Sequence, residues 1–149
     1  MANTNDQVAK YEAFINDRLH PALSQVLADR DVIYDRIAEF LKLRNNLEVL
    51  DKQSLTSLKS QVDLGANFYV QAHVPDTRYI FVSVGYGFHL QMTRQEALEY
   101  IAKKEKQLQR KADKLTDEAN KLRAQIRTFY LGIAELMQLS GTSSAAPSS

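Results

Sequence analysis

The middle of the chain, over residues 61–92, alternates regularly between apolar and polar side chains. Every even-numbered position is apolar over residues 62–74 and again over residues 80–92. Successive side chains of a strand point to opposite faces, so this period of two predicts strands with one apolar face. Pro75–Arg78 predicts the turn between the two arms of a hairpin. Glycines inside the arms predict bends that divide them into four short strands, and they are Gly65, Gly85 and Gly87.

The chain on either side of this ribbon has the pattern of a long helix with a narrow apolar seam. Over residues 98–136, a 3-4 spacing puts apolar residues at eleven of twelve seam positions. A similar seam over residues 15–50 is apolar at nine of eleven positions, the exceptions being Asp29 and Arg36. Narrow seams kept over several heptads are typical of coiled coils. They predict an α+β fold, a long antiparallel two-helix coiled coil with two small β-hairpins between the helices; a compact helical bundle is the alternative.

Helix-boundary signals indicate the domain organisation. Thr93 and Glu96 form a capping-box pattern at the start of the second helix. Pro21 predicts either a kink near residues 19–20 or a first helix that begins only there. One domain is predicted over residues 8–139. The domain is expected to contain a first helix over 8–60, β-hairpins over 61–92 and a second helix over 94–139. Outside it, we expect a flexible N-terminus over 1–7 and a disordered tail over 140–149.

Composition and charge argue against several functional classes. With 149 residues, 25% of them charged and 44% hydrophobic, the chain suits one globular domain. Its net charge of +1 offers no basic field for direct binding of nucleic acid. The absence of cysteine excludes a thiolate nucleophile, a disulfide framework and a cysteine metal site. No apolar run approaches the roughly 20 residues that span a bilayer, so no membrane partner is expected.

Catalytic motifs are absent from the sequence. There is no nucleophile elbow, Walker A loop or dinucleotide fingerprint. His73 and His89 fall on the polar face of the ribbon and could form half of a metal site. No carboxylate cluster stands at ligand spacing, so solvent-facing histidines are the favoured interpretation. We therefore expect a non-enzymatic protein without catalytic residues, cofactor or metal.

The apolar face of the ribbon needs a cover that the predicted helices do not provide. The coiled-coil seams face each other, and burying each large apolar side chain is worth roughly 1.5–3 kcal/mol. Exposed strand edges are an aggregation hazard, which is removed when strands of several chains close into a shared barrel. We therefore predict subunit assembly through the ribbon residues Leu64, Phe68, Val70, Val82, Val84, Tyr86, Phe88 and Leu90.

The free end of the coiled coil gathers a second group of large apolar residues. Several of them lie outside the strict seams, and exposed aromatic and methionine side chains suit contacts with varied partners. We predict a tip that binds clients or partners; the alternative is that these side chains only cap the coiled coil. The predicted tip residues are Tyr11, Phe14, Ile15, Phe129, Tyr130, Leu131 and Met137.

The ribbon contains VDLGANFYVQAHVPDT at Val62–Thr77 and VGYGFHLQMTRQEAL at Val84–Leu98, and the first helix contains YEAFI and LRNNLE. With these segments and its layout of helix, paired hairpins and helix, the chain resembles the α-class prefoldin subunits over about residues 8–140. These segments are most similar to one α-prefoldin-like branch. General α subunits share only a looser frame of valines and glycines.

The resemblance implies a prefoldin-like co-chaperone or scaffold subunit. Prefoldins are hetero-hexamers of α-class and β-class chains that hold non-native client proteins at coiled-coil tips. For this branch, the implied partners are the unconventional prefoldin interactor URI and β-class prefoldin subunits, with links to a RuvB-like ATPase chaperone and RNA polymerase assembly factors. A role in transcription regulation is also implied, with localisation in nucleus and cytoplasm and at the centrosome.

Two alternatives stay open on the residues alone. One is a general prefoldin α subunit that delivers unfolded actin or tubulin to a chaperonin. The other is a stand-alone coiled-coil transcription cofactor that acts outside any hexamer.

Overall fold

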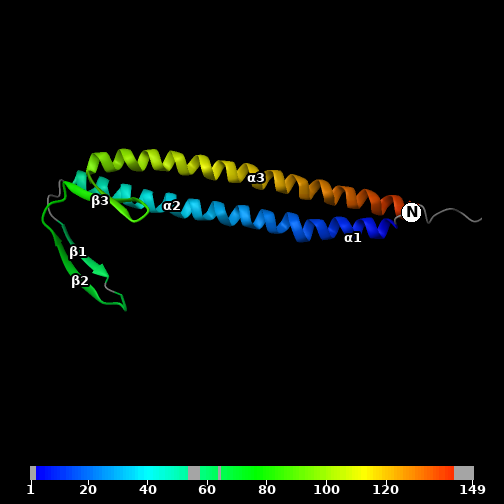
Figure 1. The fold of residues 1–149 in the computed structure, drawn as a ribbon, viewed down its shortest axis with the longest axis horizontal. Coiled ribbons are helices and arrows are strands. Elements are labelled where there is room, and N and C mark those ends of the chain that lie inside the picture. The colour runs from blue at the N-terminus through cyan, green and yellow to red at the C-terminus, as the bar shows by residue number, and fades with distance from the viewer. Residues whose placement is uncertain (1–2, 54–57, 64, 143–149) are drawn as a thin grey trace, which may run out of the picture. The chain divides into compact units, whose positions relative to one another are not determined.

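The computed structural model describes residues 3–53, 58–63 and 65–142 (Figure 1). Helical segments flank two antiparallel hairpins, which confirms the predicted α+β fold. The elements in chain order are α1 (Thr4–Phe14), the π-helical segment η1 (Ile15–Leu19), α2 (His20–Lys52), β1 (Leu58–Asp63), β2 (Tyr69–Val74), β3 (Tyr79–Gly85), β4 (Phe88–Thr93) and α3 (Arg94–Thr142).

The first helical stretch has different ends from those predicted. It begins at Thr4 rather than residue 8 and ends at Lys52 rather than residue 60. Leu58, which lies within the predicted first helix, instead opens β1 and lies opposite Val74 of β2. Pairing with β2 satisfies the backbone N–H and C=O groups of this segment, which a helix would otherwise have to satisfy. At the other end of the chain, α3 continues to Thr142, past the predicted end at residue 139.

Two compact units make up the chain, and α2 and α3 each contribute to both. The terminal unit is Met1–Tyr34 with Arg110–Ser149. Within it the two helical segments run antiparallel, because Tyr11 meets Phe129 whereas Arg30, later in the chain, meets the earlier Thr116. Its core contains the buried residues Val8, Ile15, Leu19, Ile126 and Ile133.

The hairpin unit is Asp35–Gln109. Its segments of α2 and α3 are also antiparallel, since Arg44 pairs with Glu105 at 2.9 Å and Asp51 pairs with Arg94 at 3.0 Å. The β3–β4 sheet packs on this pair of segments through a core of four buried residues. They are Leu47 of α2, Val82 of β3, and Ala97 and Ile101 of α3.

The apolar seam of α3 lies where the 3-4 spacing predicts. All twelve seam positions over residues 98–136 are buried or half-buried. On the first helical stretch the seam is wrong at two positions, because Asp29 and Arg36 are exposed while Arg30 and Ile37 are half-buried. A four-residue step where a three-residue step was expected shifts the register and keeps both of the misplaced charges in water.

A π-helical turn precedes Pro21. Ile15–Leu19 is π-helical, and the backbone N–H of His20 donates to the carbonyl of Ile15, five residues earlier. Proline lacks an N–H, and its ring crowds the carbonyl four residues before it, so an α-helix loses a hydrogen bond there. The wider π turn makes room for the proline without ending the helix. The predicted helix start at residues 19–20 is therefore wrong.

The strands form two separate two-stranded sheets, β1–β2 and β3–β4, as four short strands. The hairpin turns lie at the glycines: Gly65 has φ +90°, and Gly85 and Gly87 have φ +107° and +77°. This left-handed region is open to glycine because it has no Cβ. Pro75–Arg78 instead joins β2 to β3, which do not pair, so the prediction that it closes a hairpin is wrong.

The predicted capping box at the start of α3 is confirmed. The N–H of Thr93 donates to a Glu96 carboxylate oxygen at 3.0 Å, and the N–H of Glu96 donates to the Thr93 hydroxyl at 3.2 Å. These two reciprocal bonds satisfy donors that the first helical turn would otherwise leave unpaired.

Replacing Thr93 with alanine should lower the free energy of unfolding by about 1 kcal/mol, because the N3 amide loses its side-chain acceptor. Denaturant unfolding followed by circular dichroism measures the change. Thr93→Ser keeps the hydroxyl and should stay close to the wild type. Equal stability of the alanine and serine variants would show that the cap contributes nothing.

Candidate functional site

Each hairpin exposes large apolar side chains. Phe68, beside the β1–β2 turn, is 72% exposed, and Phe88 of β4 is 69% exposed. Exposed large apolar side chains that gather on one element, rather than standing singly, indicate an interaction site. The predicted assembly residues that lie exposed are Phe68, Val70, Tyr86, Phe88 and Leu90, while Leu64 lies outside the described residues.

One of the predicted assembly residues belongs instead to the core beneath the β3–β4 sheet. Val82 is only 4% exposed and is part of the hairpin-unit core with Leu47 and Ile101. Val84 is half-buried. The chain's own helices therefore cover Val82, which is not available to a second subunit.

Two exposed aromatics on the same sheet were missed from the sequence. Tyr79 and Phe81 of β3 are 51% and 71% exposed. They occupy odd-numbered positions, which the alternation assigns to the polar face. Their residue type could have identified them, because aromatic residues are enriched in protein–protein interfaces. An exposed aromatic on an otherwise polar strand face is therefore a candidate contact with another subunit.

An ion pair stabilises the link between β2 and β3. The backbone N–H of Arg78 donates to the Asp76 carboxylate at 2.9 Å, and the guanidinium donates to it through Nε at 3.0 Å and Nη2 at 2.8 Å. These hydrogen bonds from the side chain and backbone of Arg78 lower the pKa of Asp76 to about 2. The same contact raises the pKa of Arg78.

We expect the Arg78→Ala substitution to raise the pKa of Asp76 toward its usual 3.8. In the wild type the lowered pKa means that the ion pair stabilises the link above about pH 4, and this contribution is lost as the pH falls through about 2. An NMR titration of the Asp76 carboxyl carbon measures both proteins. Arg94→Gln is the control and should change the titration little, because the charge of Arg94 is the smallest of the named causes.

The predicted tip residues of α1 lie against the end of α3. The ring of Phe129 lies 5.8 Å from that of Tyr11 and 5.2 Å from that of Phe14. Ile15 is 1% exposed within the terminal-unit core, so it cannot itself contact a client. The hydroxyl of Tyr130 lies 3.5 Å from Nε2 of His20. The exposed members of the predicted tip are Tyr11, Phe14, Tyr130, Leu131 and Met137.

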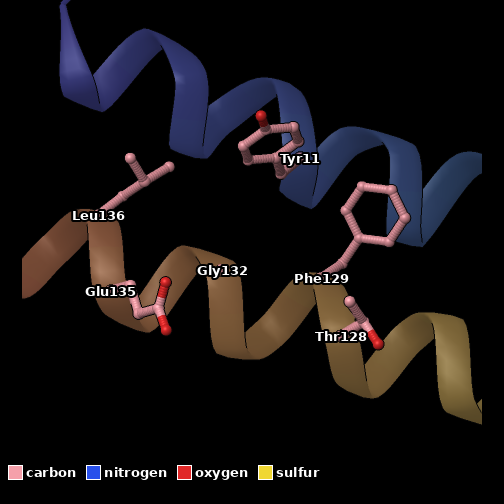
Figure 2. A pocket seen from close by; sticks show the side chains of 6 residues that line it. All are labelled: Tyr11, Thr128, Phe129, Gly132, Glu135 and Leu136. Atoms are coloured by element: carbon pink, nitrogen blue, oxygen red, sulfur yellow. The ribbon is translucent and has the colours of Figure 1, made fainter.

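A groove of about 350 Å³ lies at this tip (Figure 2). Phe129 and Leu136 extend from α3 toward α1, where Tyr11 extends toward α3, whereas Thr128 and Glu135 do not point toward α1. Gly132 contributes no side chain between them. The lining residues are Tyr11, Thr128, Phe129, Gly132, Glu135 and Leu136.

The described residues offer little for metal chemistry. His73 lies in β2 and His89 in β4, which belong to different sheets. In residues 3–53, 58–63 and 65–142, no three His, Cys, Asp or Glu side chains are grouped so that they could hold a metal ion. None of the helices in this part of the chain is both long and apolar enough to traverse a bilayer.

Comparison with known proteins places this architecture in a family. The family profile of the prefoldin subunit matches residues 19–139. The chain belongs to the prefoldin family. It is 43% identical to Protein UXT of Bos taurus, over 91% of this chain and 87% of the relative. It is 41% identical to Protein UXT of Homo sapiens, with the same coverage of the two chains.

The fold is also similar to that of a solved prefoldin. The cryo-EM structure of filamentous PFD from Methanocaldococcus jannaschii matches with a TM-score of 0.58 and 23% identity, over 78% of this chain and 98% of that one. The resemblance to α-class prefoldins, and to the UXT branch in particular, is therefore confirmed. Members of this family are non-catalytic, chaperone-type proteins, and the prefoldin fold implies oligomerisation with other prefoldin subunits.

Proposed function

We propose that this prefoldin is the α-type subunit of a URI-type prefoldin-like complex. The observation that carries the proposal is the apolar surface of the hairpins, above all Phe68 and Phe88, in a chain 43% identical to Protein UXT. Side chains this large gain roughly 1.5–3 kcal/mol each when buried, and neighbouring strands from other subunits provide the natural cover. The proposed partners are a URI-like prefoldin and β-class prefoldin subunits in a hetero-hexamer.

The complex is proposed to assist the assembly of other proteins without catalysis of its own. A RuvB-like ATPase chaperone and RNA polymerase assembly factors are the proposed associates. The proposed localisation is the nucleus and cytoplasm, including the centrosome. A contribution to transcription regulation is proposed to act through protein contacts. The net charge of +1 supports this, since direct binding of DNA needs a clustered basic face.

The deciding experiment is the mass and composition of the native complex that carries the tagged protein in its own cells. A complex of several small coiled-coil chains that includes a URI-like subunit supports the proposal. The set of general prefoldin subunits without it would favour delivery of actin and tubulin to a chaperonin. A homodimer without prefoldin partners would favour the stand-alone transcription cofactor.

Client holding is proposed for the tip, where Leu131 and Met137 are exposed. Replacing both with serine should weaken client retention about tenfold or more, because each large apolar contact can be worth roughly 1.5–3 kcal/mol. Suppression of aggregation of a chemically unfolded client by the purified complex measures this.

Val32→Ser with Val49→Ser is the matched control, since both valines are similarly exposed on α2 outside the tip. The control complex should suppress aggregation as the wild type does. Full activity of the Leu131 and Met137 variant would move client binding away from these residues.

A further inference from the structure

The groove at the tip lies over Gly132, where α3 has no side chain. The helix-surface neighbours of a residue stand three and four positions before and after it. For Gly132 these are Thr128, Phe129, Glu135 and Leu136, and all four line the groove. A Cβ placed on Gly132 would meet no atom within 4 Å. The floor of the groove is therefore bare backbone of α3.

This geometry suits the side chain of another helix. In coiled coils a side chain of one helix inserts into a hole formed by four residues of the facing helix. The four neighbours of Gly132 form such a hole, and a glycine floor lets a second helix approach closely. Its volume of about 350 Å³ lies within the range of about 300–1,000 Å³ that is usual for ligand pockets.

The walls of the hole differ in character. Tyr11, Phe129 and Leu136 form an aromatic and aliphatic side of the groove. On the other side, Glu135 carries the one charge among the lining residues, and its side chain makes no hydrogen bond or ion pair with any residue that the structure describes.

The Thr128 hydroxyl at the rim of the groove already donates a hydrogen bond to the carbonyl of Ala124 at 2.9 Å. The Glu135 carboxylate is exposed at the rim of the groove, and its negative charge is complementary to a lysine or arginine side chain.

We propose that this groove binds a basic amphipathic helix of a folded partner protein. One large apolar side chain of that helix enters the hole above Gly132, and a lysine or arginine one turn away pairs with Glu135. The inference rests on the proposed function, since it adds a partner to the proposed tip of the complex. It differs in the ligand, which is a formed helix selected by charge rather than a non-native client.

The probes are two synthetic helical peptides with leucines at 3-4 spacing, flanked by lysines in one and by glutamates in the other. Fluorescence anisotropy measures their binding to the intact native complex at low ionic strength. The lysine peptide should bind about fivefold more tightly than the glutamate peptide, as expected for one exposed ion pair. Glu135→Lys should reverse this preference. Gly132→Leu should weaken the lysine peptide about tenfold, since it fills the hole.

Glu118→Lys is the matched control, an exposed carboxylate of α3 outside the groove, and should leave the preference unchanged. Helical content of each variant is checked by circular dichroism; leucine favours a helix more than glycine does. Unchanged peptide binding in Gly132→Leu, or an unreversed preference in Glu135→Lys, overturns the inference. If the Gly132→Leu and Glu135→Lys complexes still suppress aggregation, the proposed client holding stands. A wild-type complex that selects the lysine peptide but does not suppress aggregation would overturn client holding alone.

Discussion

Replacing Phe68 with aspartate is expected to abolish co-assembly with other prefoldin subunits and to leave the chain folded. Phe68 is 72% exposed in the chain by itself, so a carboxylate there stays in water and costs little stability. In the assembled barrel the same position is expected to be buried, where an unpaired charge is strongly unfavourable. A penalty of about 3 kcal/mol alone lowers an association constant more than a hundredfold. Affinity purification of the tagged variant, followed by identification of its subunits, measures the loss.

The opposite face of the same hairpin provides the control. Gln71 lies on the polar face of β2 and is exposed. Gln71→Asp adds the same charge a short distance away and should assemble like the wild type. Normal assembly of Phe68→Asp would mean that this hairpin is not the interface. Loss of assembly in both variants would mean that the two faces are assigned incorrectly.

The Val82→Asp substitution should have the reverse effect and unfold the hairpin unit. Val82 is 4% exposed and packs with Leu47, Ala97 and Ile101, none of which can pair with a carboxylate. A buried charge without a partner should lower the free energy of unfolding by about 3–5 kcal/mol. Denaturant unfolding of the purified chain, followed by its helical circular dichroism, measures this change.

Phe81→Asp is the matched control because it makes the same substitution at the next residue, whose side chain is 71% exposed. Its stability should stay within about 0.5 kcal/mol of the wild type, as is usual for surface positions. Comparable destabilisation by both substitutions would contradict the assignment of Val82 to the core. A stable Val82→Asp chain that fails only in assembly would return Val82 to the interface.

The contrast between these two substitutions marks the limit of the period-two pattern. Phe68 and Val82 both occupy even positions of one alternating ribbon, and the pattern treats them alike. The alternation identifies an apolar face but does not say what covers it. In the structure the β3–β4 sheet turns Val82 onto the chain's own helices, while Phe68 beside the β1–β2 turn has no such cover.

The tip shows the same limit. The antiparallel arrangement of the seams correctly predicts that Tyr11 and Phe14 lie near Phe129. The seam over residues 15–50 begins at Ile15, and the structure encloses that residue as its seam position predicts. The seams do not predict that Gly132 leaves a groove. That groove depends on how one helical segment is rotated against the other, which the 3-4 spacing does not specify.

The sequence by itself determined the types of the elements, the seam of α3, the capping box at Thr93 and membership of the prefoldin family. Each of these depends on residues within a few positions of one another, or on a contiguous sequence motif. Only the tertiary structure decided which strands pair, where the seam of the first helical stretch shifts, and which apolar residues are enclosed rather than displayed. Those choices are made by contacts between segments distant in the chain, because burial depends on what lies opposite a side chain rather than on what precedes it.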